Sequence, residues 1–254
     1  MPVRRNRSGK GAMNGHDSKE RSLVSKVMDI LVSGIVEDRY GPVLPPQDVL
    51  SGEFGVSRTV MREALSMLLA RRMLDVRPKV GTRIRPMRDW LMIDEDVVSW
   101  RFRAKPDRIF LRDVIEFRAL IEPSACAQAA VRASDAEIAG IRDAFNLLRL
   151  TRHGDGNRQA ADELLHTLLL AASGNQFFQQ MTAIIHGALS LVNPILNRRE
   201  GGWENVVRAH GRVVEAIERR EPGEAEAAAA AMIGYTADEL RRSLEADPDA
   251  QREA

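Results

Sequence analysis

The sequence predicts a mainly α-helical protein of two modules: an N-terminal one with three helices and a small β-hairpin, and a C-terminal all-α antiparallel helical bundle. Three observations predict this division. Apolar residues recur at helical spacing in both parts. A period of two is confined to residues 73–84. Charge also changes sign, because residues 1–88 contain 17 Lys and Arg against 9 Asp and Glu, whereas the remainder contains 20 against 27.

The length and composition bound the class of protein. A chain of 254 residues, 44% of them hydrophobic, can form one large domain or two smaller ones. Its single cysteine, Cys126, excludes an intramolecular disulfide and is typical of a reducing compartment. No apolar run approaches the roughly 20 residues that span a bilayer, and the basic N-terminus lacks the apolar core of a secretory signal. We therefore expect a soluble cytoplasmic protein with no membrane partner.

The N-terminal module is expected over residues 18–86, after a disordered basic arm at 1–17. Ser22 is a suitable N-cap for a first helix that Gly41-Pro42 ends. A second, short helix starts at Pro45-Pro46, since proline is tolerated in a first turn, and Ser57 caps a third. Alternation from Leu74 to Ile84 then predicts the hairpin. Three helices followed by a hairpin make a winged helix-turn-helix.

The C-terminal module is expected over residues 107–246. A linker at 87–106 precedes it and contains a short amphipathic segment from Trp90 to Trp100, and a disordered tail at 247–254 follows it. Helical patterns broken by glycine, serine or proline fill the module and indicate a bundle of about six helices. The expected helices are 107–132, 135–153, 158–173, 175–197, 203–220 and 222–246.

The third helix has the division of faces that a recognition helix needs. Arg58, Thr59 and Arg62 lie at i, i+1 and i+4, so they share one face, while apolar residues line the other. Arginine can bind guanine through two hydrogen bonds, and a hydroxyl can bind phosphate or a base edge. A solvated basic face is the alternative interpretation of these residues.

Three segments of this module carry a family resemblance: Leu44-Pro45-Pro46-Gln47, the run Phe54-Gly55-Val56-Ser57-Arg58-Thr59-Val60-Met61-Arg62-Glu63-Ala64-Leu65, and Gly81-Thr82. They resemble the DNA-binding domain of the GntR family of bacterial regulators. The resemblance implies that certain residues contact DNA on the third helix and at the wing tip, namely Ser57, Arg58, Thr59, Arg62, Lys79 and Gly81. Pro46-Gln47-Asp48 departs from the family pattern, so we expect no phosphate contact at that point.

Asp162 and His166 form a candidate metal site in the second module. They lie at i and i+4 and share one face of an otherwise apolar helix, and a carboxylate beside an imidazole suits a divalent cation. His210 follows 44 residues later on another helix and can converge with them inside a bundle. Local pairing of Asp162 with His166 along the helix is the alternative. His186 is expected to be a packed or surface residue.

A second resemblance covers this module, through Phe117-Arg118-Ala119-Leu120-Ile121-Glu122-Pro123, Ser173-Gly174-Asn175, and His210 with Val213-Val214-Glu215-Ala216-Ile217. These segments look like the all-helical ligand-binding (FCD) domain of the FadR-like branch of the family, where an Asp and three His hold Zn²⁺ or a similar ion. Asp162, His166 and His210 match the first three ligands, and Met232 stands at the fourth position. The resemblance implies that Arg118 binds the carboxylate of an organic acid; a salt bridge between Arg118 and Glu122 is the alternative.

The segment from Trp90 to Trp100 is similar to one in regulators of galactonate and related sugar-acid catabolism, which also lack the last histidine. The alternative is that its two tryptophans pack the linker onto the bundle. The resemblances together imply a homodimeric regulator, a repressor that releases a palindromic DNA operator when a sugar acid binds. No nucleophile–base set is recognisable, so we expect no enzyme. A metal-dependent helical enzyme, or a pure metal sensor, fused to a DNA-binding domain is the alternative.

Overall fold

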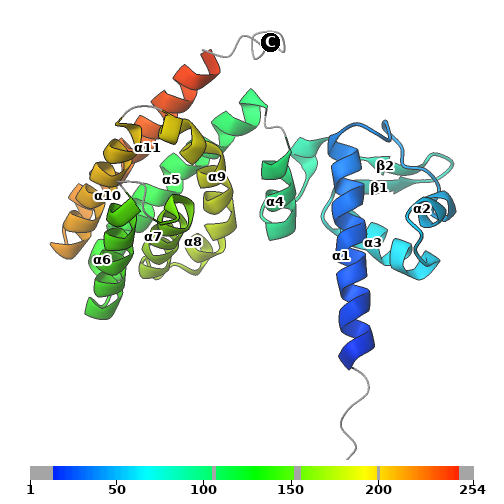
Figure 1. The fold of residues 1–254 in the computed structure, drawn as a ribbon, viewed down its shortest axis with the longest axis horizontal. Coiled ribbons are helices and arrows are strands. Elements are labelled where there is room, and N and C mark those ends of the chain that lie inside the picture. The colour runs from blue at the N-terminus through cyan, green and yellow to red at the C-terminus, as the bar shows by residue number, and fades with distance from the viewer. Residues whose placement is uncertain (1–13, 105–106, 152–155, 199–200, 246–254) are drawn as a thin grey trace, which may run out of the picture. The chain divides into compact units, whose positions relative to one another are not determined.

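The computed structural model describes residues 14–104, 107–151, 156–198 and 201–245. They divide into two compact units, one ending at Trp100 and the other beginning at Arg101 (Figure 1). The prediction of a mainly α-helical protein is confirmed, and the strands of the described part form one two-stranded antiparallel sheet.

The N-terminal unit is a winged helix-turn-helix, as predicted. Its elements are α1 (Asn14–Val36), α2 (Gln47–Glu53), α3 (Arg58–Ala70), β1 (Leu74–Arg77), β2 (Gly81–Ile84), the 3₁₀ turn η1 (Met87–Asp89) and most of α4 (Glu95–Arg103). Helix α1 packs on α3, and the β1–β2 register pairs Leu74 with Ile84 and Arg77 with Gly81. Gly55 has φ of 62°, a left-handed conformation that a residue without Cβ adopts readily, and it lets the chain turn between α2 and α3.

Helix α1 begins earlier than the sequence predicted. Residues 14–17 were expected to belong to a disordered arm, but they form the first turn of α1, and Ser22, expected as N-cap, lies inside the helix. The segment is polar and has no apolar stripe, so periodicity carries no signal there. A helix that is already nucleated extends with one new hydrogen bond for each residue it orders. Residues 1–13 of the predicted arm, like the predicted tail at 247–254, lie outside the described residues.

The predicted linker is largely part of the N-terminal unit. Trp90, Val97 and Trp100 are buried in the same hydrophobic cluster as the core residues of α1 and α3. The indole N–H of Trp100 donates to Asp29 Oδ1 at 2.6 Å. Arg71, which follows α3, pairs with Asp94 and Asp96 at 3.0 and 2.7 Å. The interpretation that the two tryptophans pack onto the bundle is therefore wrong, because their apolar surface is buried in the core of the N-terminal unit.

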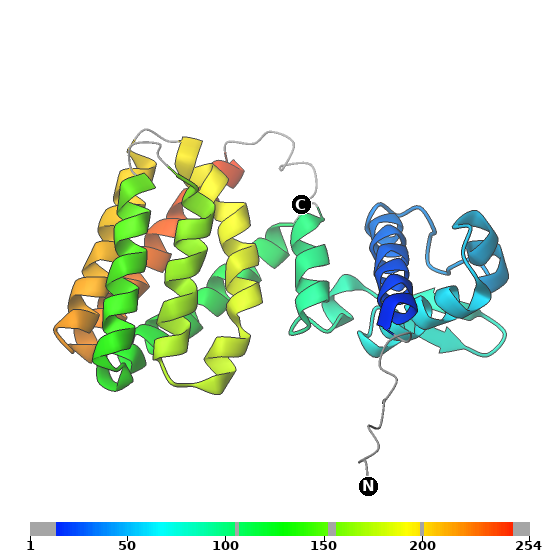
Figure 2. The same cartoon turned by 60° about the horizontal axis from the view of Figure 1, so that its bottom comes forward.

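The C-terminal unit is an all-α bundle, and Figure 2 shows its helices running side by side. They are α5 (Arg108–Arg132), α6 (Asp135–Leu150), α7 (Arg158–Ala172), α8 (Gln176–Gln180), α9 (Thr182–Arg198), α10 (Gly202–Glu218) and α11 (Pro222–Glu245). Polar side chains accept hydrogen bonds at the N-termini of several of them, which satisfies first-turn N–H groups. These N-caps are Asp107, Ser134, Asn157 and Asn175.

The predicted helix at 175–197 is two helices, α8 and α9, which meet at Met181. The N–H of Met181 bonds to the carbonyl of Phe178, three residues back. The hydroxyl of Thr182 donates to the carbonyl of Gln179 at 2.8 Å. A Thr side chain that bonds to a nearby carbonyl competes with the helical ladder. Because the apolar period continues across this break, the pattern alone does not mark it.

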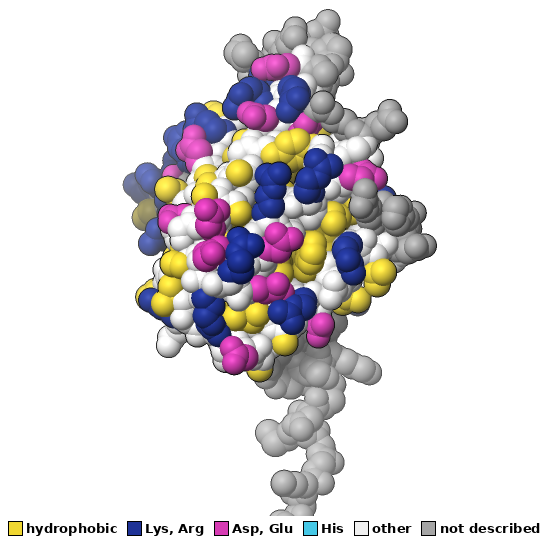
Figure 3. All heavy atoms as spheres, turned by 90° about the vertical axis from the view of Figure 1, so that its left-hand side faces the viewer, with side chains coloured by type: hydrophobic (Ala, Val, Ile, Leu, Met, Phe, Trp, Pro, Cys, Tyr) yellow, Lys and Arg dark blue, Asp and Glu magenta, His cyan; other side chains and the backbone are white. Residues whose placement is uncertain are grey.

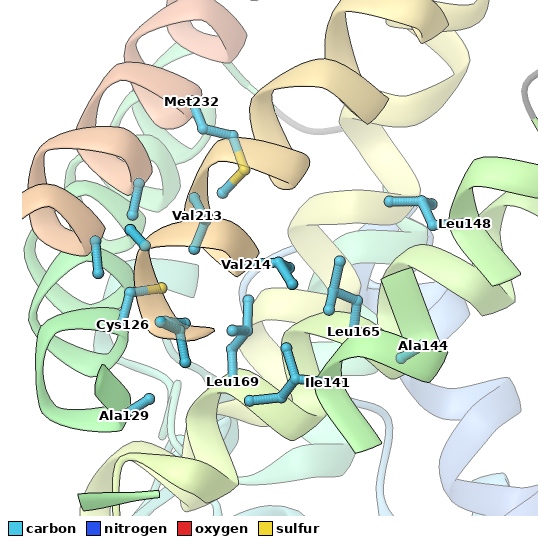
Figure 4. Packing of buried hydrophobic residues seen from close by; sticks show 14 of the residues in the cluster. Cys126, Ala129, Ile141, Ala144, Leu148, Leu165, Leu169, Val213, Val214 and Met232 are labelled. Atoms are coloured by element: carbon cyan, nitrogen blue, oxygen red, sulfur yellow. The ribbon is translucent and has the colours of Figure 1, made fainter. Parts of the chain in front are cut away.

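The bundle core is one large hydrophobic cluster, and Figure 4 shows side chains of α5, α6, α7, α10 and α11 meeting in it. Leu165 of α7 is fully buried, and Met232 of α11 is 4% exposed. Cys126 of α5 belongs to the same cluster. In this core, side chains of α7 and α10 meet, which positions the candidate metal ligands described below.

Candidate functional site

The candidate DNA-binding surface is the exposed face of α3. The N–H of Val60 donates to Ser57 Oγ at 3.2 Å, so Ser57 caps the helix as predicted from its sequence. Arg58, Thr59 and Arg62 are exposed together, whereas five apolar residues of the helix are buried, namely Val60, Met61, Ala64, Leu65 and Leu68. The helix therefore presents two guanidinium groups and a hydroxyl to solvent at its N-terminal end, where unpaired N–H groups also favour phosphate.

A surface hollow of about 330 Å³ lies between α2 and α3. The residues that line it are Pro46, Gln47, Asp48, Arg58, Thr59 and Arg62. Asp48 pairs with Arg58 at 3.0 Å, and both side chains are more than half exposed. An exposed pair of this kind contributes about 0–1 kcal/mol, so Arg58 can exchange Asp48 for another anion.

The candidate wing tip is the turn between β1 and β2. Lys79 has φ of 64° and Gly81 has φ of 100°. Both residues are exposed. The N–H of Val80 bonds to the carbonyl of Arg77 at 3.1 Å and closes the turn. A lysine at a hairpin tip carries its charge away from the body of the unit, as binding to a nucleic acid groove requires.

The candidate metal site lies inside the bundle, where α7 meets α10. Asp162, His166 and His210 are each at most 3% exposed. One ligand atom from each of the three lies within 4.8 Å of the others. The Nε2 atoms of His166 and His210 are 3.0 Å apart, and Asp162 Oδ1 lies 3.3 Å from His210 Nε2 and 3.8 Å from His166 Nε2. The convergence of His210 with the α7 pair is as the sequence predicted.

The hydrogen bonds of the two imidazoles leave both Nε2 atoms as lone-pair donors. His166 Nδ1 lies 2.9 Å from Glu122 Oε2, and His210 Nδ1 lies 2.9 Å from the carbonyl of Val206. Both partners are acceptors, so each Nδ1 carries a proton, and a ring in its neutral form then has its lone pair on Nε2, next to the Nε2 of the other ring. Burial lowers the pKa of His210 and favours this neutral form.

These residues fit a divalent cation. Two lone pairs that face each other at 3.0 Å repel unless a positive charge lies between them. Asp162 Oδ1 is buried and has no hydrogen-bond partner, although it lies beside both rings. Two atoms about 2.0–2.1 Å from one zinc ion are roughly 2.9–3.4 Å apart. Met232 is buried against the core, and its thioether is a poor ligand for such an ion, so the candidate site offers three ligand residues.

Arg118 forms the ion pair that was one of its two predicted roles. Its Nε donates to Glu122 Oε1 at 2.5 Å, and the two residues are 2% and 3% exposed. Burial alone would raise the pKa of Glu122, but Arg118 and His166 outweigh it and lower this pKa to about 2. Arg118 Nη1 is buried and has no partner. The guanidinium therefore keeps a donor for a second anion while its charge is neutralised by Glu122.

A small cavity joins these groups. Its lining includes Arg118, Asp162, Asn193, His210 and Met232. The cavity has a free volume of about 10 Å³, which is about what one water molecule needs. In this conformation the cavity has room for about one water molecule, and an organic acid would require the surrounding helices to separate.

The two units match two known protein families. Residues 23–84 match the gntR family of bacterial regulatory proteins, and residues 113–235 match the FCD domain. The chain belongs to the GntR family. It is accordingly a DNA-binding transcriptional regulator of the GntR/FCD type rather than an enzyme.

Named relatives of this GntR regulator are similar along most of their length. The galactonate operon transcriptional repressor of Escherichia coli (strain K12) is 27% identical over 222 residues, which are 85% of this chain and 96% of that protein. The transcriptional repressor NanR of Salmonella arizonae is 25% identical over 84% of both chains. A solved structure of Lar, which controls the expression of the Listeria monocytogenes agr system, shares the fold: it covers 86% of this chain and 97% of its own with a TM-score of 0.59 at 16% identity.

The surface of the regulator's bundle is mixed in charge. Figure 3 shows Lys, Arg, Asp and Glu interspersed on one face of the bundle, with no histidine on the part of that face that is described. The excess of basic residues belongs to the N-terminal module, where the GntR-type DNA-binding domain lies. Among the described residues, no helix is both long and apolar enough to cross a membrane.

Among the described residues of the bundle, His186 does not join the trio. His186 lies on α9, where its Nε2 is 2.9 Å from Thr167 Oγ1, and this agrees with the expectation of a packed residue. His153 lies outside the described residues. Asn193 was not among the predicted site residues, although it lines the cavity and donates to Asp162 Oδ2 at 2.9 Å. The sequence signal that could have identified Asn193 is an amide side chain among the apolar residues of α9.

Proposed function

We propose that the chain is a homodimeric repressor that binds a palindromic operator and releases it when a hydroxylated organic acid, a sugar acid, binds beside a divalent ion in the bundle. One observation carries the proposal. Three potential ion ligands and a buried guanidinium with a free N–H line one cavity in a domain that a DNA-binding unit precedes.

The proposal for DNA rests on the exposed face of α3 and on the wing tip. Arg58 and Arg62 bind base edges or phosphates in the major groove, Ser57 and Thr59 bind phosphate, and Lys79 and Gly81 approach the minor groove. One chain has one such recognition helix, and a dimer with two-fold symmetry has two. Two helices related by a two-fold axis bind two half-sites that are related by the same axis, so the operator is palindromic. An operator on the chromosome makes the cytoplasm the place where the protein acts.

The proposal for metal is that Asp162, His166 and His210 hold Zn²⁺ or a similar ion. When bound, the ion supplies a positive charge that can accept oxygen ligands. The three residues of the chain that hold it are buried and come from two helices, so the ion links α7 to α10. Glu122 orients His166 through Nδ1, and Val206 does the same for His210.

The proposal for the effector is that Arg118 Nη1 binds its carboxylate. A guanidinium matches a carboxylate in geometry, and one of its N–H groups is free here. The similarity to a galactonate operon repressor supports a sugar acid. Because the cavity has room for about one water, an acid must displace α9, α10 or α11 on entry. Such a displacement gives the bundle two states that differ in ligand affinity, as an allosteric repressor requires.

The test combines a binding assay with an operator assay on the full chain. Thermal unfolding with D-galactonate, other sugar acids and dicarboxylates is measured with and without Zn²⁺, since a ligand of the native state raises its stability. Acids that stabilise the protein are then added to the protein–operator complex in fluorescence anisotropy. We expect a sugar acid to stabilise the Zn²⁺-loaded protein and to release DNA. If no acid does either, the effector model is wrong.

A pure metal sensor is the second candidate, and the small size of the cavity favours it. In that case Zn²⁺ alone changes operator affinity and no acid adds to the effect. Titration of the protein–operator complex with Zn²⁺ in the absence of acid separates the two functions.

A further inference from the structure

Asn193 offers an unpaired acceptor to the cavity. Among the described residues, four buried side-chain nitrogen or oxygen atoms have no hydrogen-bond partner, and three of them belong to residues that line this cavity. These three are Asp162 Oδ1, Arg118 Nη1 and Asn193 Oδ1. Asp162 Oδ1 faces the candidate ion, and Arg118 Nη1 is the proposed donor to a carboxylate. Asn193 Oδ1 has neither assignment, and Asn193 itself is 3% exposed.

The orientation of the Asn193 amide is fixed by its neighbours. Its Nδ2 donates to Asp162 Oδ2 at 2.9 Å and to Gln159 Oε1 at 3.0 Å. Gln159 is itself oriented, because its Nε2 donates to Glu163 Oε1 at 2.6 Å. Turning the Asn193 amide over would place its oxygen against a carboxylate oxygen and an amide oxygen, both of which are acceptors. Both protons of the nitrogen are therefore used, and Oδ1 is the atom left for a ligand.

A buried acceptor of this kind selects its ligand. A ligand that donates an O–H to this oxygen binds more tightly than a ligand of the same shape without the O–H, because the second ligand leaves the buried oxygen without a hydrogen bond. A carboxylate has no proton to donate at neutral pH, so a simple dicarboxylate offers this atom nothing. A hydroxyl of a polyhydroxy acid can donate to it.

We propose that Asn193 is a specificity-determining residue whose Oδ1 accepts a hydrogen bond from one hydroxyl of the acid, so that the site selects hydroxylated acids over their deoxy analogues. This inference rests on the proposed function and names the chemical class of its effector. Arg118 Nη1 binds the carboxylate of the acid, and Asn193 Oδ1 binds a hydroxyl elsewhere on the same molecule. Asn193 Nδ2 also donates to Asp162 Oδ2. The side chain that binds the hydroxyl therefore also positions a candidate ion ligand.

The first test uses the unaltered Zn²⁺-loaded chain and calorimetry with D-galactonate and its single-deoxy analogues. We expect removal of one particular hydroxyl to weaken binding by at least about tenfold, the usual scale for a hydrogen bond lost against a buried partner. If every analogue binds within twofold of D-galactonate, the inference is wrong and the proposed function stands. If neither D-galactonate nor any other sugar acid of the thermal-unfolding series binds, both the inference and the proposed function are wrong.

The second test repeats the series with Asn193→Ala, and with Asn197→Ala as a matched control. Asn197 lies one turn further along α9, is exposed, and accepts a hydrogen bond from Arg158 Nη1 at 2.9 Å. We expect Asn193→Ala to bring the ratio of the two dissociation constants for the sensitive hydroxyl close to one, and Asn197→Ala to leave it unchanged. A merely structural role of Asn193 would weaken D-galactonate and the deoxy analogue equally, and an unchanged ratio would overturn the proposal.

Asn193→Ala also removes a donor to Asp162, so the Zn²⁺ affinity of each variant is measured by competition with a chromophoric chelator. Both acids are then compared at saturating Zn²⁺. If Asn193→Ala does not fold, the series in the unaltered chain still decides, because it requires a hydroxyl-dependent affinity without any substitution.

Discussion

Glu122 accepts a hydrogen bond from His166, with 2.9 Å between Oε2 and Nδ1, while its other oxygen binds Arg118 Nε. One buried carboxylate thus touches a candidate ion ligand and the candidate carboxylate-binding residue. It fixes the ring of His166 and neutralises the guanidinium of Arg118. A substitution of Glu122 should therefore affect both the binding of the ion and the binding of the acid's carboxylate by Arg118.

Glu122→Gln keeps the shape of the side chain and removes its charge. We expect Zn²⁺ affinity to fall by about 10–100-fold, the usual effect of losing a partner that orients a metal-binding histidine. We also expect unfolding stability to fall by about 3–5 kcal/mol, because the buried charge of Arg118 loses its partner. Chelator competition and urea unfolding measure the two effects. Glu116→Gln, an exposed position on the same helix, is the control and should change neither.

Removal of metal should lower the melting temperature of the protein. An ion that binds the folded state at about 100 times its dissociation constant adds about 2.7 kcal/mol, and chelation removes that contribution. His166→Ala and His210→Ala should each abolish the Zn²⁺-dependent shift and the release of DNA by acid, but leave operator binding intact. His186→Ala is the matched control, since His186 bonds to Thr167 outside the trio. A Zn²⁺-dependent shift that survives in His166→Ala would place the ion elsewhere.

The parts of the fold that depend on local sequence could be predicted. Apolar spacing, the Ser57 cap and helix-breaking residues are local, and they marked α3 and most of the bundle. The surface on which a segment packs is not local. Trp90 and Trp100 are apolar and amphipathically spaced, but nothing within that segment tells which of the two units buries them.

The candidate site shows the same limit. The spacing of Asp162 and His166 put both on one face of α7, and His210 was expected to converge with them from another helix. The free Nη1 of Arg118 and the free Oδ1 of Asn193 depend on which neighbours occupy the other atoms of each group. Those neighbours come from α5, α7 and α9, so only the packed structure distinguishes an occupied polar atom from a free one.

Replacement of Arg58 or Arg62 by alanine should weaken binding to the operator by roughly 1–3 kcal/mol each. Both side chains are exposed on the same face of α3. The operator is first obtained by selection from a library of random duplexes, and affinity is measured by fluorescence anisotropy. Arg241→Ala, an exposed arginine on α11, should have no effect. Unchanged affinity in both α3 variants would remove this helix from the groove.

Cys126 should be unreactive in the folded protein. Burial raises the pKa of its thiol, and the charge of Glu122 raises it further. The thiolate is the reactive form, so at pH 8 the native protein should not react with Ellman's reagent. The same protein unfolded in guanidinium should release one equivalent, because the chain contains one cysteine. Rapid reaction of the native protein would show that α5 opens easily from the core.

Operator affinity should fall steeply as salt concentration rises. The N-terminal 88 residues contain 17 basic and 9 acidic residues, and a dimer presents this excess twice. Each phosphate that the protein neutralises contributes about −0.9 to the slope of log K against log salt, because counterions are released from the duplex. Residues 1–13 carry Arg4, Arg5, Arg7 and Lys10 and end before α1 begins. Their deletion should therefore reduce both affinity and slope without changing which sequence is preferred. If the truncated protein prefers a different sequence, the arm contacts base edges rather than acting as a polycation.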